Sequence, residues 1–223
     1  MSYLCLTGEF LPSRLDFMKI PKPISRLIES FEKLPGIGPK SAQRLVFYLM
    51  RVPENEISEF AENLLDLKKS VVFCEICRNI DESSPCSICE DYQRNQNQLI
   101  VVTSPLDVFA FEKVGFKGVY QVLHGNIDPL NNVGPEELKI HILIRRLKEL
   151  VEKSETIEVI LATSTSLEGE STAMYISKMI KEQVPEASKI KISRIARGIP
   201  IGGDIEYADD ITLSKALEGR SHF

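Results

Sequence analysis

The hydrophobic positions of the chain follow two periods, and the change between them falls at about residue 98. Before this point, apolar residues recur every three or four positions, which predicts helices over residues 24–31, 45–50 and 54–69. We expect the apolar side of the third helix to pack against the first two. After the change, short apolar runs alternate with helical segments, a pattern typical of a parallel sheet with helices on both faces. The pattern therefore predicts a helical N-terminal region followed by an α/β domain.

The α/β part contains four predicted strands with helices between them. The strands are expected at residues 99–103, 118–123, 157–163 and 190–195, and the helices at residues 106–114, 135–153 and 171–183. Ligands of such sheets bind beyond the carboxyl ends of the strands. A site in this domain is therefore expected among residues 103–107, 124–132 and 164–170.

Four cysteines form the most specific chemical pattern in the chain. Cys74, Cys77, Cys86 and Cys89 are spaced as Cys-x2-Cys-x8-Cys-x2-Cys. Two such pairs supply four thiolates to one tetrahedral Zn²⁺, which leaves no position for a catalytic water, so one structural zinc ion is predicted. A pair of disulfides or a redox Cys-x-x-Cys is the alternative, but the short polar loop between the pairs favours zinc. Cys5 is distant in sequence and is expected to take no part.

A Leu-Pro-Gly-Ile-Gly-Pro-Lys turn joins the first two predicted helices. Gly36 and Gly38 allow backbone angles that other residues resist, and Pro39 suits the first turn of a helix. The free N–H groups of such a helix start bind phosphate without reading a base. Lys40 and Arg44, one turn apart, extend this contact along one face. We expect these positions to bind DNA; the alternative is a plain helical hairpin with a tight turn.

The distribution of charge agrees with a nucleic-acid partner at one end of the chain. The net charge is −5 at pH 7, but residues 14–51 carry eight basic and three acidic side chains, a net +5, and the remainder carries −10. Such asymmetry is typical of a protein that meets a polyanion with one region only.

The composition is that of a globular chain, with 43% apolar and 26% charged residues and no apolar run of membrane-spanning length. Glu9, Arg14 and Asp16 interrupt the N-terminal segment, so no secretory signal is predicted. Together with cysteines spaced for a metal, this indicates a protein of the reducing cytoplasm, without a membrane partner.

Several further motifs stand in one order along the chain. They are Val102-Thr-Ser-Pro-Leu-Asp107, Val122-Leu-His-Gly125, Gly134-Pro-Glu-Glu-Leu138, Ala162-Thr-Ser-Thr-Ser-Leu-Glu-Gly-Glu170 and Arg194-Ile-Ala-Arg-Gly-Ile-Pro-Ile-Gly-Gly203. With the hairpin and the cysteine array, this order resembles the RecR family of bacterial recombination mediators, from about Met18 to Arg220.

The resemblance implies an α/β protein with a helix-hairpin-helix region, a small C4 zinc finger, a Toprim-type parallel α/β domain and a C-terminal tail. The implied boundaries are an N-terminal extension over residues 1–22, the hairpin region over 23–70, the finger over 71–96, the Toprim domain over 97–196 and an oligomerisation segment over 197–223.

The function implied by the resemblance is that of a non-catalytic, DNA-binding mediator in DNA repair. Members of the family act as clamp-like adaptors with RecF and RecO and promote RecA loading on gapped DNA. They assemble into homo-oligomers, so a dimer or tetramer is expected here. Gaps and junctions between single-stranded and double-stranded DNA are the expected partners.

The Toprim resemblance also raises the question of catalysis, because Toprim enzymes hold Mg²⁺ with one Glu and an Asp-x-Asp pair. By motif position, Thr103 replaces the Glu, and Ser164 and Ser166 replace the two Asp residues. Mg²⁺ prefers carboxylate ligands. The lost carboxylates favour the adaptor over the alternative, a Mg²⁺-dependent nuclease or topoisomerase, so no catalytic residue is predicted.

Other acidic side chains remain near the predicted strand ends. Asp107, Glu168 and Glu170 are candidate contacts for a partner protein or a weakly bound cation. The alternative is that they cap the following helices and interact favourably with the helix dipoles. Two ring-bearing side chains also have two interpretations: Phe73 either stacks on a base or packs internally, and His124 either serves a site or makes a structural hydrogen bond.

Overall fold

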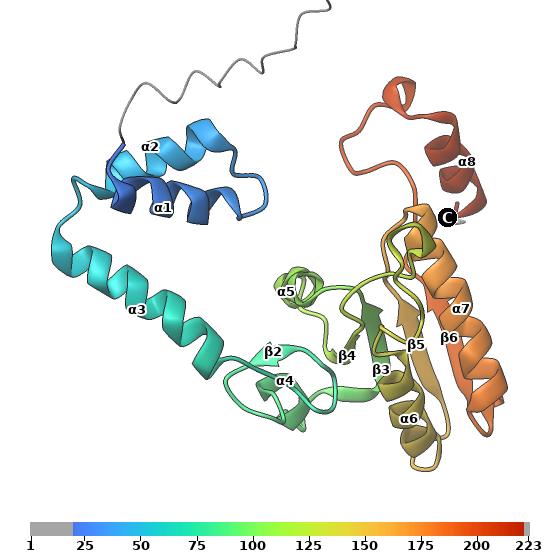
Figure 1. The fold of residues 1–223 in the computed structure, drawn as a ribbon. Helices are drawn as coiled ribbons and strands as arrows, with labels where there is room; N and C mark the ends of the chain where they lie inside the picture. Colours follow the sequence, from blue (N-terminus) through green and yellow to red (C-terminus); the bar gives the residue numbers. More distant parts are fainter. Residues whose placement is uncertain (1–19, 221–223) are drawn as a thin grey trace, which may run out of the picture. The chain divides into compact units, whose positions relative to one another are not determined.

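The structure, a computed structural model, describes residues 20–220 of the chain (Figure 1). Cys5 and most of the predicted N-terminal extension, residues 1–22, lie outside this part. The chain divides into two compact units, with the boundary between Lys68 and Lys69. Within residues 20–220, no helix is both long and apolar enough to cross a membrane.

The first unit is built on a helical hairpin. Helix α1 (Lys22–Glu32) and helix α2 (Pro39–Leu49) both carry a proline in the first turn, where the missing N–H is not needed. Their contact is small: Ile28 of α1 packs with Ala42 and Val46 of α2, which lie one turn apart. The two predicted helices and the turn between them are therefore present.

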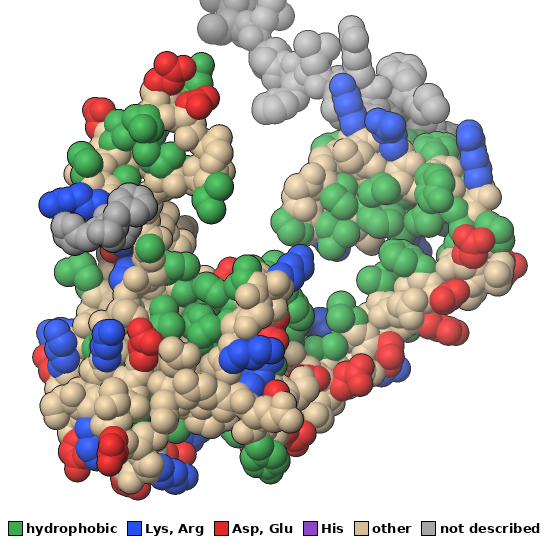
Figure 2. Space-filling model, turned by 180° about the vertical axis from the view of Figure 1, so that it is seen from behind, with side chains coloured by type: hydrophobic (Ala, Val, Ile, Leu, Met, Phe, Trp, Pro, Cys, Tyr) green, Lys and Arg blue, Asp and Glu red, His purple; other side chains and the backbone are tan. Residues whose placement is uncertain are grey.

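Helix α3 (Glu54–Ser70) forms as the apolar period predicts, but none of its residues is buried. The predicted packing of its apolar side against the hairpin helices is therefore wrong for the single chain. Apolar side chains that remain at least one-third exposed in this unit are Leu27, Leu34, Leu45, Phe47, Tyr48, Met50, Ile57, Phe60, Leu64, Leu65 and Leu67. Figure 2 shows apolar side chains over much of the visible surface of the hairpin helices.

The second unit begins with a small module around the cysteines. Strand β1 (Val72–Phe73) pairs antiparallel with strand β2 (Ile80–Asp81), and a single helical turn, α4 (Ser87–Glu90), follows. These elements are too short to bury an apolar core of their own. The cluster at the centre of the module consists of Cys74, Cys77 and Cys86.

The main domain is a four-stranded parallel sheet of order β4-β3-β5-β6. Its strands are β3 (Asn95–Val102), β4 (Gly118–Val122), β5 (Ile157–Leu161) and β6 (Ile190–Arg194). Alternating residues of β3 point to opposite faces. Leu99 and Val101 join the core under helices α6 (Ile140–Val151) and α7 (Leu167–Gln183), whereas Ile100 and Val102 pack under helix α5 (Pro105–Lys113). The predicted parallel sheet with helices on both faces is confirmed (Figure 1).

After the cysteine module, three helices differ from the sequence-based expectation. Helix α6 begins at Ile140 rather than near residue 135, because residues 134–139 form turns before it. Helix α7 begins four residues earlier than predicted, because the Ser166 hydroxyl accepts a hydrogen bond from the Gly169 N–H and caps it. Helix α8 (Asp210–Glu218) was not predicted and is capped by Asp209.

A polar cluster fixes the chain where it leaves the cysteine module. The Arg94 guanidinium donates to both carboxylate oxygens of Glu112 on α5, at 2.8 and 2.6 Å, and the Tyr120 hydroxyl of β4 donates to the same carboxylate at 2.6 Å. These donors, Arg94 first, hold the pKa of Glu112 below its ordinary value of 4.5. Burial raises the pKa of Tyr120, so its proton stays in this hydrogen bond at neutral pH.

Glu112→Gln should lower the free energy of unfolding by about 2 kcal/mol at pH 7, because charged hydrogen bonds of this kind contribute about 1.5–3 kcal/mol. The folded-state pKa of Glu112 is depressed, so its contribution is present above the ordinary pKa of 4.5 and is lost as pH falls through the lower folded value. Urea unfolding at neutral and acid pH measures this difference. The exposed Glu155→Gln is the control, and an equal effect of both variants at pH 7 would contradict the role of the cluster.

Candidate zinc centre, DNA-binding hairpin and Toprim crevice

The four predicted zinc ligands converge in space. The Sγ atoms of Cys74, Cys77, Cys86 and Cys89 all lie within 4.8 Å of one another, with 3.5 Å between Cys77 and Cys86 and 3.9 Å between Cys74 and Cys89. Tetrahedral Zn²⁺ with Zn–S bonds of about 2.3 Å places its sulfurs about 3.8 Å apart. The donor set therefore fits one structural zinc ion, and none of the four cysteines forms a disulfide.

The cysteine module supplies its own electrostatic support for thiolates. The Asn79 N–H donates to the Cys77 sulfur and the Cys86 N–H donates to the Cys74 sulfur, both at 3.4 Å. The hydrogen bond between Cys77 and Cys86 lowers the pKa of the Cys86 thiol and raises the pKa of the Cys77 thiol. Thiolates are the form that binds zinc. Within residues 20–220, no other group of three or more His, Cys, Asp or Glu side chains gathers its ligand atoms this closely.

The module is joined to the edge of the sheet by backbone and ring contacts. The carbonyl of Cys77 accepts a hydrogen bond from the Val122 N–H of β4 at 2.8 Å, and His124 Nε2 lies 2.7 Å from the Arg78 carbonyl oxygen. Phe73 meets the His124 ring edge-on at 4.9 Å between centroids, and the Arg78 guanidinium lies over the Phe73 ring. These contacts give Phe73 and His124 structural roles in holding the module to the sheet.

The hairpin turn presents an uncapped helix start. Gly36 has φ +80°, a conformation that favours glycine, and Gly38 stands before α2 with no side chain that caps its first N–H groups. A Cβ at Gly38 would meet no protein atom within 4 Å, so the space beside it is open to a ligand. Lys40 and Arg44 are exposed on the same helix, one turn apart. The arrangement offers positive charge and free N–H groups to a phosphate.

We use the name Toprim crevice for residues 103–107 and 164–170, the segments that follow β3 and β5. It carries hydroxyl groups at the positions where the motif predicts metal ligands. Thr103, directly after β3, donates through Oγ1 to Asp107 Oδ2 at 3.1 Å, and the Ser104 N–H donates to the same oxygen at 2.9 Å. Asp107 and Ser104 thus form a capping box for α5. Ser164 and Ser166, after β5, lie 2.9 Å apart through their hydroxyl oxygens.

The acidic candidates of the crevice do not gather into one site. Asp107 caps α5, Glu168 lies half-buried in the first turn of α7, and Glu170 forms ion pairs with Arg194 and Arg197. The hydrogen bond from Arg197 lowers the pKa of Glu170. Burial opposes this effect, but the hydrogen bond from Arg194 adds to it, so the pKa lies below its ordinary value. The sequence pattern assigned no role to the two arginines, although both stand in the motif that begins at the last residue of β6.

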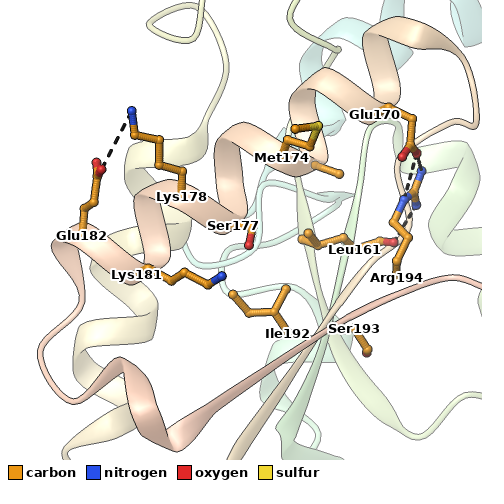
Figure 3. Close-up of a pocket in the computed structure, with 11 residues that line it drawn as sticks. Leu161, Glu170, Met174, Ser177, Lys178, Lys181, Glu182, Ile192, Ser193 and Arg194 are labelled. Carbon is orange, nitrogen blue, oxygen red and sulfur yellow. Dashed lines mark hydrogen bonds and ion pairs between the residues drawn. The ribbon is translucent and has the colours of Figure 1, made fainter.

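A cavity of about 610 Å³ lies beside this ion pair, between α7 and β6. Figure 3 shows Glu170 and Arg194 at one end and the Lys178–Glu182 pair at the other, with Met174 and Ile192 between them. The cavity was not predicted from sequence.

The four-cysteine module, the parallel α/β domain and the helical hairpin define the class of this protein: a modular zinc-finger protein with a parallel α/β domain. Comparison with known families agrees segment by segment. The RecR helix-hairpin-helix family matches residues 24–68, the RecR four-cysteine zinc finger domain matches 71–91, the Toprim domain matches 97–196 and the RecR C-terminal family matches 198–221.

Curated relatives give the same result over nearly the full chain. The proteins named "Recombination protein RecR" from Staphylococcus aureus strains JH9 and Newman are each 49% identical over 205 residues, which covers 92% of this chain and 99% of theirs. The chain belongs to the RecR family. It carries that family's helix-hairpin-helix region, structural zinc finger, Toprim domain and C-terminal segment.

Proposed function

We propose that this protein is a non-catalytic mediator of DNA recombination and repair that binds DNA through its helical hairpin. The observation that carries the proposal is the pairing of two features in one chain. The hairpin offers an uncapped helix start flanked by exposed Lys40 and Arg44, whereas the Toprim crevice has Thr103, Ser164 and Ser166 where Toprim enzymes have carboxylates. The first feature binds a phosphate backbone, and the second lacks the means to hold Mg²⁺ for phosphate chemistry.

The partners and the DNA contacts of this proposal follow from the family resemblance. The protein acts with RecF and RecO and promotes RecA loading on gapped DNA, with Gly36, Gly38, Lys40 and Arg44 holding phosphates. Asp107 and Glu168, at the crevice, are the candidate contacts for a partner protein. Their carboxylates lie at helix starts on the Toprim domain, and no proposed DNA contact uses them.

The competing activity is a Mg²⁺-dependent nuclease or topoisomerase. Zinc-loaded protein incubated with supercoiled plasmid and Mg²⁺ is expected to leave the plasmid intact, because the crevice presents hydroxyl groups instead of carboxylates. Glu168→Ala serves as the variant for any activity that is observed. Mg²⁺-dependent nicking that disappears in Glu168→Ala would replace the adaptor with an enzyme.

We also propose that the protein works as a homo-oligomer, a dimer or a tetramer. Two segments support this: α3, which buries no residue in the single chain, and the C-terminal segment, where Ile201, Tyr207 and Ile211 are each more than 70% exposed. Apolar surface of this kind marks interfaces. Light scattering of the protein alone is expected to give a multiple of the 25.2 kDa chain mass, and with gapped duplex such a multiple plus the mass of the DNA. A single chain under both conditions would contradict the proposal.

A further inference from the structure

Arg194, the last residue of β6, is surrounded by oxygen atoms at the carboxyl end of the sheet. Its Nη1 donates to the Leu161 carbonyl at 2.6 Å, and its Nη2 donates to the carbonyls of Thr163 and Ser164 at 2.7 and 2.8 Å. The same guanidinium donates to Glu170 Oε1 from Nη2 at 2.7 Å and from Nε at 3.1 Å. Three carbonyl oxygens and one carboxylate oxygen thus converge on one positive charge.

This oxygen set has the chemistry of a site for a hard cation. Carbonyl and carboxylate oxygens are the ligands that Mg²⁺ and Ca²⁺ take in proteins. In this chain the positive charge comes from a guanidinium, which remains protonated at every physiological pH and distributes several N–H donors in fixed directions. The carbonyls of Thr163 and Ser164 belong to the segment that carries the second set of metal ligands in Toprim enzymes.

A second arginine completes the neutralisation of Glu170. Arg197 Nη2 also forms an ion pair with Glu170 Oε1, and the side chains of Arg194 and Arg197 are only 22% and 23% exposed. A divalent ion at this carboxylate would lie next to two fixed positive charges. The residues present therefore do not fit a Mg²⁺ site at Glu170.

We propose that Arg194 is a built-in replacement for the divalent cation of Toprim enzymes, with Glu170 as its counter-ion, so that the crevice is neutralised permanently and needs no metal. The guanidinium holds the end of β5 to the first turn of α7, because it binds the Leu161 carbonyl and Glu170 at the same time. Gly169 permits this approach, because a Cβ there would overlap the Ser164 backbone. Asp107 and Glu168 stay available to partners under this proposal.

The cluster of Arg194, Arg197 and Glu170 also holds the start of the C-terminal segment in place. Arg197 lies three residues after Arg194, and its carbonyl oxygen lies close to Gly219 beyond α8. Gly198 lies against Ala216, since a Cβ at Gly198 would stand 3.6 Å from the nearest Ala216 atoms. A metal-independent crevice would thus keep the start of this segment in place whatever the concentration of free Mg²⁺.

The test uses the full, zinc-loaded protein and Mn²⁺ as the probe, with the free Mn²⁺ signal followed by electron paramagnetic resonance. Wild-type protein is expected to bind no Mn²⁺ at the crevice up to about 1 mM, the weak end of the range for protein cation sites. Mg²⁺ is expected to leave its melting temperature unchanged, because an ion that does not bind the native state cannot stabilise it. Stoichiometric Mn²⁺ binding by wild type that Glu170→Gln abolishes would overturn the proposal.

A variant tests the replacement directly. Arg194→Ser is expected to melt at a lower temperature than wild type, and Mn²⁺ should restore part of the loss, with affinity at least about tenfold above wild type. The exposed Arg145→Ser is the matched control and should show neither effect. A folded Arg194→Ser chain that Mn²⁺ stabilises no more than Arg145→Ser would overturn the replacement. If Arg194→Ser does not fold, Arg194→Lys is used instead. This variant keeps the positive charge and should remain insensitive to Mn²⁺. Mn²⁺ binding by a folded Arg194→Lys chain would also overturn the proposal. Neither readout involves DNA, so the result is independent of the proposed function.

Discussion

Cys77→Ser is expected to remove the zinc ion and to unfold the module of residues 71–91. The module has a two-residue strand pair and one helical turn, and its buried centre is made of cysteine side chains. Such a segment lacks the apolar core that would hold it together without metal. In finger peptides, structural zinc contributes about 10–16 kcal/mol of apparent binding free energy, most of which appears as folding free energy.

Three measurements check this expectation. Zinc content should fall from one ion per chain to near zero, proteases should cut within residues 71–91, and the melting transition should shift downward or become broad. Cys5→Ser, the same chemical change at the cysteine outside the array, is the control and should retain full zinc. A soluble, zinc-free Cys77→Ser protein with normal melting would show that the metal does not support the fold.

Charge reversal at the hairpin, Lys40→Glu together with Arg44→Glu, is the second large effect. Each phosphate contact contributes about 0.9 to the slope of log affinity against log salt concentration. Loss of two contacts should reduce the slope by about 2 and the affinity about 100-fold at 0.1 M salt relative to wild type. The loss should be equal for unrelated DNA sequences, because phosphate contacts carry no base specificity.

A matched pair of substitutions separates this effect from a change in net charge. Lys153→Glu with Lys178→Glu changes the charge by the same amount at exposed positions of the Toprim domain. This control should bind DNA with nearly the wild-type salt slope. Unchanged affinity of the hairpin variant across a salt titration would remove the hairpin as the DNA site.

Much of the fold was predictable because its elements have strong local signals. Apolar runs of the right length predicted all four strands of the sheet, and cysteine spacing predicted a zinc centre whose sulfurs do meet within 4.8 Å. The Pro-Gly turn predicted the helical hairpin. In each case the signal lies inside the element or small module that it predicts.

The role of Arg194 could not be predicted in this way. Its four partners belong to the ends of two other elements, and their oxygens meet the guanidinium only after β5, β6 and α7 have packed. The early start of α7 was also missed. Ser166 was interpreted only as the position of a lost metal ligand, and its action as a helix cap depends on the local backbone conformation. Periodicity also cannot tell whether the apolar side of α3 is covered by its own chain or by another.

The hydrogen bond between Cys77 and Val122 has a consequence for solubility. Strand β4 lies at the edge of the sheet, yet all five of its residues are buried. An edge strand left open is a template for pairing with other chains and a route to aggregation. By placing the Cys77 carbonyl against the Val122 N–H, the zinc module covers part of that edge. Zinc starvation would therefore be expected to produce insoluble protein rather than merely inactive protein.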